Sequence, residues 1–82
     1  MDIHIDKNSL IPVYRQIVNA IESMIETRAL KEGDILPSMN ELAEMLEISK
    51  ETSKKAYIVL RDDGKIESKQ GKGFYVRADG GA

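Results

Sequence analysis

The sequence predicts a mainly α fold in which three helices are followed by a small antiparallel β-hairpin. Apolar residues recur at spacings of three and four in the first half of the chain, which is the spacing of amphipathic helices. A third run of helical period lies between Ser49, which is expected to cap the start of a helix, and Gly64, where the helix is expected to stop. After Gly64 the period changes to two, and Gly71 and Gly73 interrupt it, as the turn of a hairpin does.

The first helix is expected to begin at Ile11 or Pro12 and to run for about four to five turns. Its predicted inward face consists of Tyr14, Ile17, Val18, Ile21, Met24 and Ile25. Residues 1–9 are polar and are expected to form a short N-terminal tail, and residues 78–82 a C-terminal tail or the start of a linker to an absent domain. Residues 10–77 are therefore predicted to form one domain.

The second helix is predicted from a capping signal. Ser38 and Glu41 have the spacing of a capping box, in which each side chain bonds the other's backbone N–H. The inward face is predicted to consist of Leu42, Ala43, Met45 and Leu46. The helix should end near Glu47, and the preceding Ile35-Leu36 piece is expected to be extended and able to pair with the hairpin.

The third helix, predicted over residues 49–63, follows the second after only three or four residues, as in a helix-turn-helix. Placed at about 100° per residue, one sector is apolar and the nearly opposite one is basic. The apolar sector is predicted to hold Thr52, Ala56, Val59 and Leu60, and the basic one Lys50, Lys54 and Arg61. A basic helix beside a basic, glycine-tipped hairpin is typical of a winged helix-turn-helix, in which one element enters a DNA major groove and the other contacts the flank.

The net charge of the whole chain does not favour DNA binding, but the distribution of charge along the chain does. The 82-residue chain has a net charge of −2, which argues against nucleic acid if the charge is spread evenly. It is not: residues 1–47 carry 4 basic and 9 acidic side chains, and residues 48–77 carry 8 basic and 4 acidic ones. A partner within a Debye length of about 10 Å responds mainly to the local charge. Modest DNA affinity with a marked salt dependence is therefore expected.

Composition argues against several other classes of protein. The chain has no cysteine and one histidine, His4, which is expected to be solvated. No nucleophile and base or metal-ligand spacing can be assembled, so neither an enzyme nor a cofactor or metal site is expected. A membrane span and a signal peptide are also not expected, which predicts a cytoplasmic protein.

The ordered motifs resemble the N-terminal DNA-binding domain of the GntR family of bacterial transcriptional regulators. They cover roughly residues 10 to 77: Pro12-x-Tyr14-x-Gln16-Ile17, Gly33-Asp34-x-Leu36-Pro37-Ser38, Glu41-Leu42-Ala43, Ile48-Ser49-Lys50-x-Thr52, Ala56, Leu60, Gly64 and Gln70-Gly71-x-Gly73-x-Tyr75-Val76. The resemblance implies a repressor that binds a palindromic DNA operator as a homodimer. It further implies that helix 49–63 enters the major groove, that wing 69–74 contacts the flanking backbone or minor groove, and that a small-molecule effector acts through a C-terminal domain not in this chain.

The residues expected to contact DNA lie on the two predicted helix starts and the wing. They are Ser38, Asn40, Lys50, Thr52, Lys54, Gly71 and Lys72, with Ser53, Lys55, Tyr57 and Arg61 as weaker candidates. Asn40 and the lysines at 50 and 54 replace basic and arginine residues common in the family, which implies a different base preference. For each lysine the alternative is a solvated surface charge, and for the whole chain it is a winged-helix protein–protein interaction module.

Overall fold

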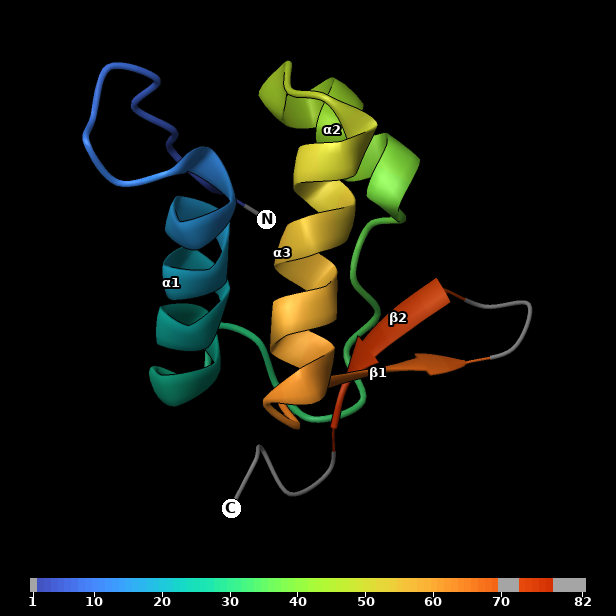
Figure 1. The fold of residues 1–82 in the computed structure, drawn as a ribbon. Helices are drawn as coiled ribbons and strands as arrows, with labels where there is room; N and C mark the ends of the chain where they lie inside the picture. The colour runs from blue at the N-terminus through green and yellow to red at the C-terminus, as the bar shows by residue number, and fades with distance from the viewer. Residues whose placement is uncertain (1, 70–72, 78–82) are drawn as a thin grey trace.

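The computed structural model describes residues 2–69 and 73–77 and has the expected architecture. The elements are α1 (Val13–Glu26), α2 (Met39–Leu46), α3 (Lys50–Asp62), β1 (Ile66–Lys69) and β2 (Gly73–Val76). Figure 1 shows α1 and α3 side by side, α2 across the N-terminal half of α3, and the hairpin beside the C-terminal half of α3. In the described part of the chain, no helix is long and apolar enough to cross a membrane.

The predicted capping signals set the helix ends. The Ser38 hydroxyl accepts the Glu41 N–H at 3.0 Å, and the Glu41 carboxylate accepts the Ser38 N–H at 2.9 Å, which confirms the capping box. Ser49 caps α3 by accepting the Thr52 N–H at 3.1 Å. Gly64 follows α3 with a φ of 77°, a left-handed conformation that a glycine adopts without a Cβ clash.

The hairpin is a two-stranded antiparallel sheet in which Ile66 pairs with Val76 and Ser68 with Phe74. The extended piece before α2 joins it, as predicted: Ile35 forms a β-bridge with Tyr75, and the Leu36 N–H donates to the Phe74 carbonyl at 2.9 Å. The connector therefore fixes the base of the wing. Two predicted wing-tip residues, Gly71 and Lys72, lie outside the described residues.

The core lies where the three helices, the connector and the inner face of the hairpin meet. It consists of Ile3, Ile17, Val18, Ile21, Leu36, Leu42, Ala56, Tyr57, Leu60, Ile66, Phe74 and Val76. The prediction that Met45 faces inward is wrong, because this side chain is 52% exposed. The buried pair on α2 is Leu42 and Ala43, with Leu46 partly buried, so the face that packs on α3 turns Met45 outward.

The segment before α1, which was predicted to be a short tail, is attached to the domain by several contacts. Ile3 is only 8% exposed and belongs to the core. The Asp6 N–H donates to the Gln16 side-chain oxygen at 2.8 Å, and the Gln16 amide nitrogen donates to the Asp6 carbonyl at 2.9 Å. The Lys7 ammonium donates to the Glu47 carbonyl at the end of α2 at 2.8 Å. Sequence polarity concealed this, because only Ile3 and Ile5 contribute apolar contacts, and the others use the Asp6 backbone and the Lys7 ammonium.

Candidate nucleic-acid interface

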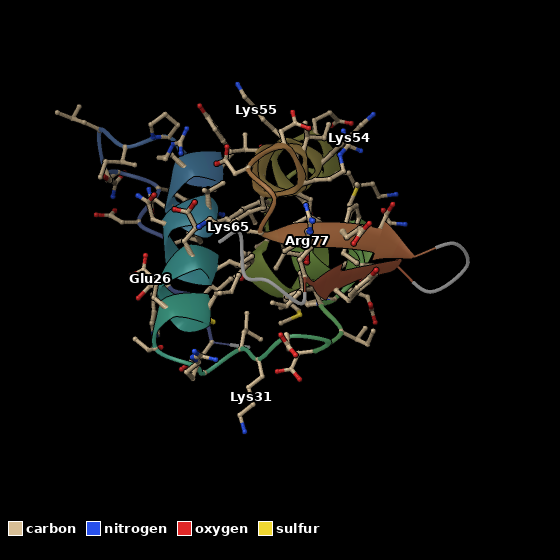
Figure 2. The ribbon with its side chains drawn as sticks, turned by 90° about the horizontal axis from the view of Figure 1, so that it is seen from below. Glu26, Lys31, Lys54, Lys55, Lys65 and Arg77 are labelled. Carbon is tan, nitrogen blue, oxygen red and sulfur yellow. The ribbon has the colours of Figure 1, made fainter. Side chains whose placement is uncertain are left out.

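The predicted DNA-contacting residues of α2 and α3 lie in the N-terminal parts of these two helices. Asn40 is the second residue of α2, Lys50 the first of α3, and Lys54 lies one turn further along α3; all three are exposed. In Figure 2 Lys54 and Lys55 extend outward from α3, on the side of the domain opposite Lys31. The first turns of two adjacent helices also direct unpaired backbone N–H groups outward, which suits contact with an anion.

Two buried hydrogen bonds hold the beginning of α2 against α3. The Ser53 hydroxyl donates to the Met39 carbonyl at 2.8 Å, and the Tyr57 hydroxyl donates to the Pro37 carbonyl at 2.6 Å. The expectation that Ser53 and Tyr57 contact DNA is therefore wrong, since both side chains are 0% exposed. Each instead fixes the segment on which Asn40 is placed.

The surroundings of Tyr57 keep its hydroxyl protonated, as a donor must be. Burial raises the pKa of Tyr57 above its ordinary value of 10.0, and the nearby Glu41 carboxylate raises it further. The ring also packs against Phe74, with 4.8 Å between ring centroids. Tyr57 therefore links α3 to the start of α2 through its hydroxyl and to the hairpin through its ring.

Ser38 and Thr52 each have two groups that could donate to a phosphate, the hydroxyl and the backbone N–H, and in both residues the N–H is already hydrogen-bonded. Contact through their backbone N–H groups is ruled out, because Glu41 accepts the first and the Ser49 hydroxyl accepts the second. The Thr52 and Ser49 hydroxyl oxygens lie 2.8 Å apart, so one hydroxyl proton of that pair is left to donate elsewhere. For both residues the remaining donor is a hydroxyl.

A cation–π contact between Lys55 of α3 and the Tyr14 ring of α1 joins these two helices. The Lys55 ammonium lies 4.3 Å from the centre of the Tyr14 ring, and the Arg15 guanidinium carbon lies 5.5 Å from it. Tyr14 is partly buried and packs against the core, as expected, and its ring also lies within cation–π distance of these two cations. Helical spacing within α1 could not indicate this contact, because Lys55 is on another helix.

Arg61, a further weaker candidate for DNA contact, is paired with the neighbouring Asp62 at 3.6 Å.

The geometry defines the class of protein. Two helices joined by a tight turn, the second with lysines on its exposed face, precede an antiparallel hairpin that packs beside the C-terminal half of that helix. This arrangement is a winged helix-turn-helix domain.

The chain belongs to the GntR family, because residues 13–76 match the family described as "Bacterial regulatory proteins, gntR family". It is 38% identical over 74 residues to the HTH-type transcriptional repressor YtrA of Bacillus subtilis (strain 168), a match that covers 90% of this chain and 57% of YtrA. The resemblance seen in the sequence motifs is thereby confirmed.

Solved structures agree with the family and the fold. YtrA from Sulfolobus acidocaldarius, a GntR-family transcription factor, superposes with a TM-score of 0.87 at 41% identity, over 92% of this chain and 64% of that one. AraR(DBD) in complex with operator ORX1 superposes with a TM-score of 0.79 at 26% identity, over 93% of this chain and 95% of that one. The chain thus spans about three fifths of the two YtrA proteins, 57% and 64% of their lengths.

Proposed function

We propose that this domain binds double-stranded DNA in a sequence-specific manner, as part of a cytoplasmic, non-enzymatic transcriptional repressor of the GntR type. The observation that carries the proposal is the close superposition on AraR(DBD), which was solved in complex with an operator. The naming of the Bacillus subtilis relative as an HTH-type transcriptional repressor supports the same function. We also propose that a homodimer binds a palindromic operator and that a small-molecule effector acts through a further domain.

The proposed docking places residues 49–63 in the major groove and residues 69–74 against the flanking backbone or minor groove. Lys50, Lys54 and Asn40 are proposed to reach base edges or phosphates, since all three are exposed in the N-terminal parts of α2 and α3. The hydroxyls of Ser38 and Thr52 would donate to phosphate. At the wing tip, Gly71 and Lys72 are proposed to contact the backbone or the minor groove.

The chemistry of these side chains predicts how the domain selects its site. A lysine is a flexible point charge and cannot form the two-pronged hydrogen bond that arginine makes to guanine. An asparagine can bond the adenine edge through both of its side-chain atoms. We therefore expect weaker guanine selection by Lys50 and Lys54, and an adenine preference where Asn40 approaches the groove.

The experiment has two stages: selection of bound oligonucleotides from a random pool, then titration of the selected DNA at several salt concentrations. Lys50→Gln and Lys54→Gln should each lower the salt slope by about 0.9 if the lysine contacts a phosphate. If it contacts a base, the variant should lose about 1–3 kcal/mol at one operator position. Lys31→Gln is the matched control, because it removes the same charge from the opposite side of the domain (Figure 2).

A different outcome would favour the second candidate function, a protein–protein interaction module. The net charge of −2 and the acidic first half of the chain are the observations that support this alternative. If no oligonucleotide is enriched and no complex forms even at low salt, the DNA-binding proposal is refuted. Binding to DNA without sequence preference would refute the proposed operator recognition. It would still support a DNA-binding surface based on charge.

A further inference from the structure

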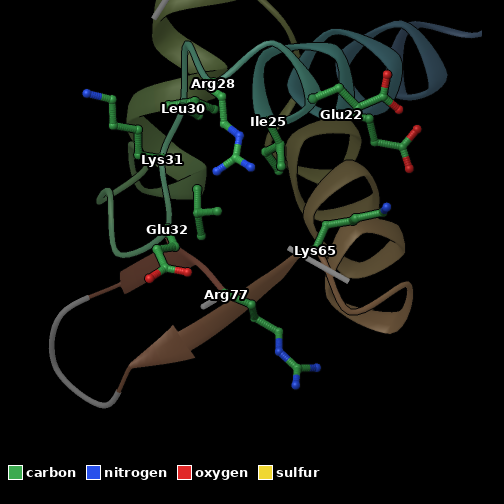
Figure 3. A pocket seen from close by; sticks show the side chains of 10 residues that line it. Glu22, Ile25, Arg28, Leu30, Lys31, Glu32, Lys65 and Arg77 are labelled. Carbon is green, nitrogen blue, oxygen red and sulfur yellow. The ribbon is translucent and has the colours of Figure 1, made fainter. Parts of the chain in front are cut away.

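A charged cavity lies at the end of the domain away from the first turns of α2 and α3. Its volume is about 380 Å³, within the range of sites for small ligands. Apolar side chains of Ile25, Leu30 and Val76 form part of its wall. The remaining lining residues are all charged: Glu22, Glu26, Arg28, Lys31, Glu32, Lys65 and Arg77. Figure 3 shows Arg28 directed toward Ile25 and the middle of the cavity, whereas Lys31 points away.

Two lining residues break local rules of chain structure. Arg28 has a φ of 68°, a left-handed conformation that is unfavourable for an L-residue and that glycine usually occupies after a helix. Glu26 is the last residue of α1, where the helix dipole disfavours a carboxylate, and no basic residue is present in that last turn. Rule-breaking residues concentrate at functional sites, and these two border the same cavity.

Three of the charged lining residues, Glu22, Arg28 and Lys65, are not neutralised by a close ion pair in the part of the chain that the structure describes. Within the described residues, Arg28, Lys65 and Glu22 form no ion pair, since the pairs observed there are His4 with Asp2 and Arg61 with Asp62. Lys65 and Glu22 are both partly buried, so their charges are only partly solvated. A ligand that brings the complementary charges would therefore gain hydrogen bonds that the domain itself does not make.

We propose that this cavity binds a small zwitterion with an apolar body, of the α-amino acid class. A pure anion would be repelled by Glu22 and Glu26 on α1, and a pure cation by Arg28 and Lys65. A zwitterion can direct its carboxylate to the Arg28 guanidinium, its ammonium to the α1 carboxylates, and its apolar side chain to Ile25 and the other apolar lining residues.

Three probes with the same apolar body test the proposal: L-leucine, N-acetyl-L-leucine, which is only an anion, and L-leucinamide, which is only a cation. Each is titrated into the ¹⁵N-labelled chain and followed by the shifts of backbone amide signals. L-leucine should give saturable shifts at Ile25, Arg28 and Val76, and the other two should bind about tenfold more weakly because each lacks one charge-assisted contact. No saturable shift with L-leucine, or equal affinity for all three, would overturn the proposal.

Variants separate ligand binding from a purely structural role. Arg28→Gly removes both the guanidinium and the backbone strain, so it should weaken L-leucine binding about tenfold while raising the midpoint of thermal unfolding. Glu26→Gln should weaken binding without lowering that midpoint. Arg15→Gln, near the other end of α1, is the matched control and should bind as the wild type does. Unchanged affinity in Arg28→Gly refutes the site, whether or not the domain binds DNA.

Discussion

Replacing Tyr57 by phenylalanine removes one oxygen atom from the junction of α3 with the start of α2. That hydroxyl is 2.6 Å from the Pro37 carbonyl, and the side chain is 0% exposed. The substitution leaves the Pro37 carbonyl without its donor, and such a loss costs about 1–3 kcal/mol. Since each kcal/mol moves the midpoint of a domain of this size by roughly 4–8 °C, we expect thermal unfolding to shift down by at least about 4 °C.

The same substitution should change how stability depends on pH. An unfolded tyrosine ionises near pH 10, whereas burial raises the pKa of folded Tyr57 above that value. Above about pH 10 the unfolded state therefore loses a proton that the folded state keeps, and wild-type stability falls as pH rises. The loss is about 1.4 kcal/mol at one pH unit above 10, so the advantage of wild type over Tyr57→Phe should shrink by about that amount between about pH 9 and 11.

Thermal unfolding followed by circular dichroism measures the midpoint shift, and urea unfolding at several pH values measures the free-energy difference. Tyr14→Phe is the matched control in both. The Tyr14 hydroxyl forms no hydrogen bond within the described residues, so its removal should change stability little. Equal destabilisation by the two substitutions, or a difference between wild type and Tyr57→Phe that does not change with pH, would refute the role assigned to the buried hydroxyl.

Three further predictions concern other parts of the domain. Tyr14→Leu removes the ring beneath the Lys55 ammonium and should weaken binding to a selected operator about twofold to fivefold, measured by fluorescence anisotropy, whereas an unchanged affinity would exclude Lys55 from the interface. Ser38→Ala removes the acceptor of the Glu41 N–H and should lower the free energy of unfolding by about 1 kcal/mol in urea titrations; no loss would mean the capping box is not stabilising. Ile3→Ala should cost about 2 kcal/mol or more in the same assay, and a cost near zero would show that the first residues do not belong to the core.

Much of the fold could be predicted because its signals are local. The capping box at Ser38, the cap at Ser49 and the left-handed Gly64 each depend on residues within a few positions, and all three occur where the sequence placed them. The pairing of Ile35 with the hairpin was also expected from its extended character. For the candidate interface, the exposure of Lys50 and Lys54 on one face of α3 could be predicted, because they lie one helical turn apart.

Tertiary packing determined which face of each helix was buried. The α3 residues 53, 56, 57 and 60 have the spacing of a buried stripe, but the apolar residues of α3 suggested a face turned by about one position, with Thr52 inside and Tyr57 outside. Met45 was likewise placed inward because it is apolar, although α2 packs through its other side.

The sequence by itself determined the number, order and ends of the elements and the side chains available for DNA, because these depend on backbone dihedrals and hydrogen bonds between near neighbours. Only the tertiary structure decided that Ser53 and Tyr57 support α2, that Tyr14 contacts Lys55, and that Arg28 faces a cavity. The physical reason is that a helical period states which residues share a face but not what that face meets. A polar side chain can be buried wherever a carbonyl from a distant segment accepts a hydrogen bond from it.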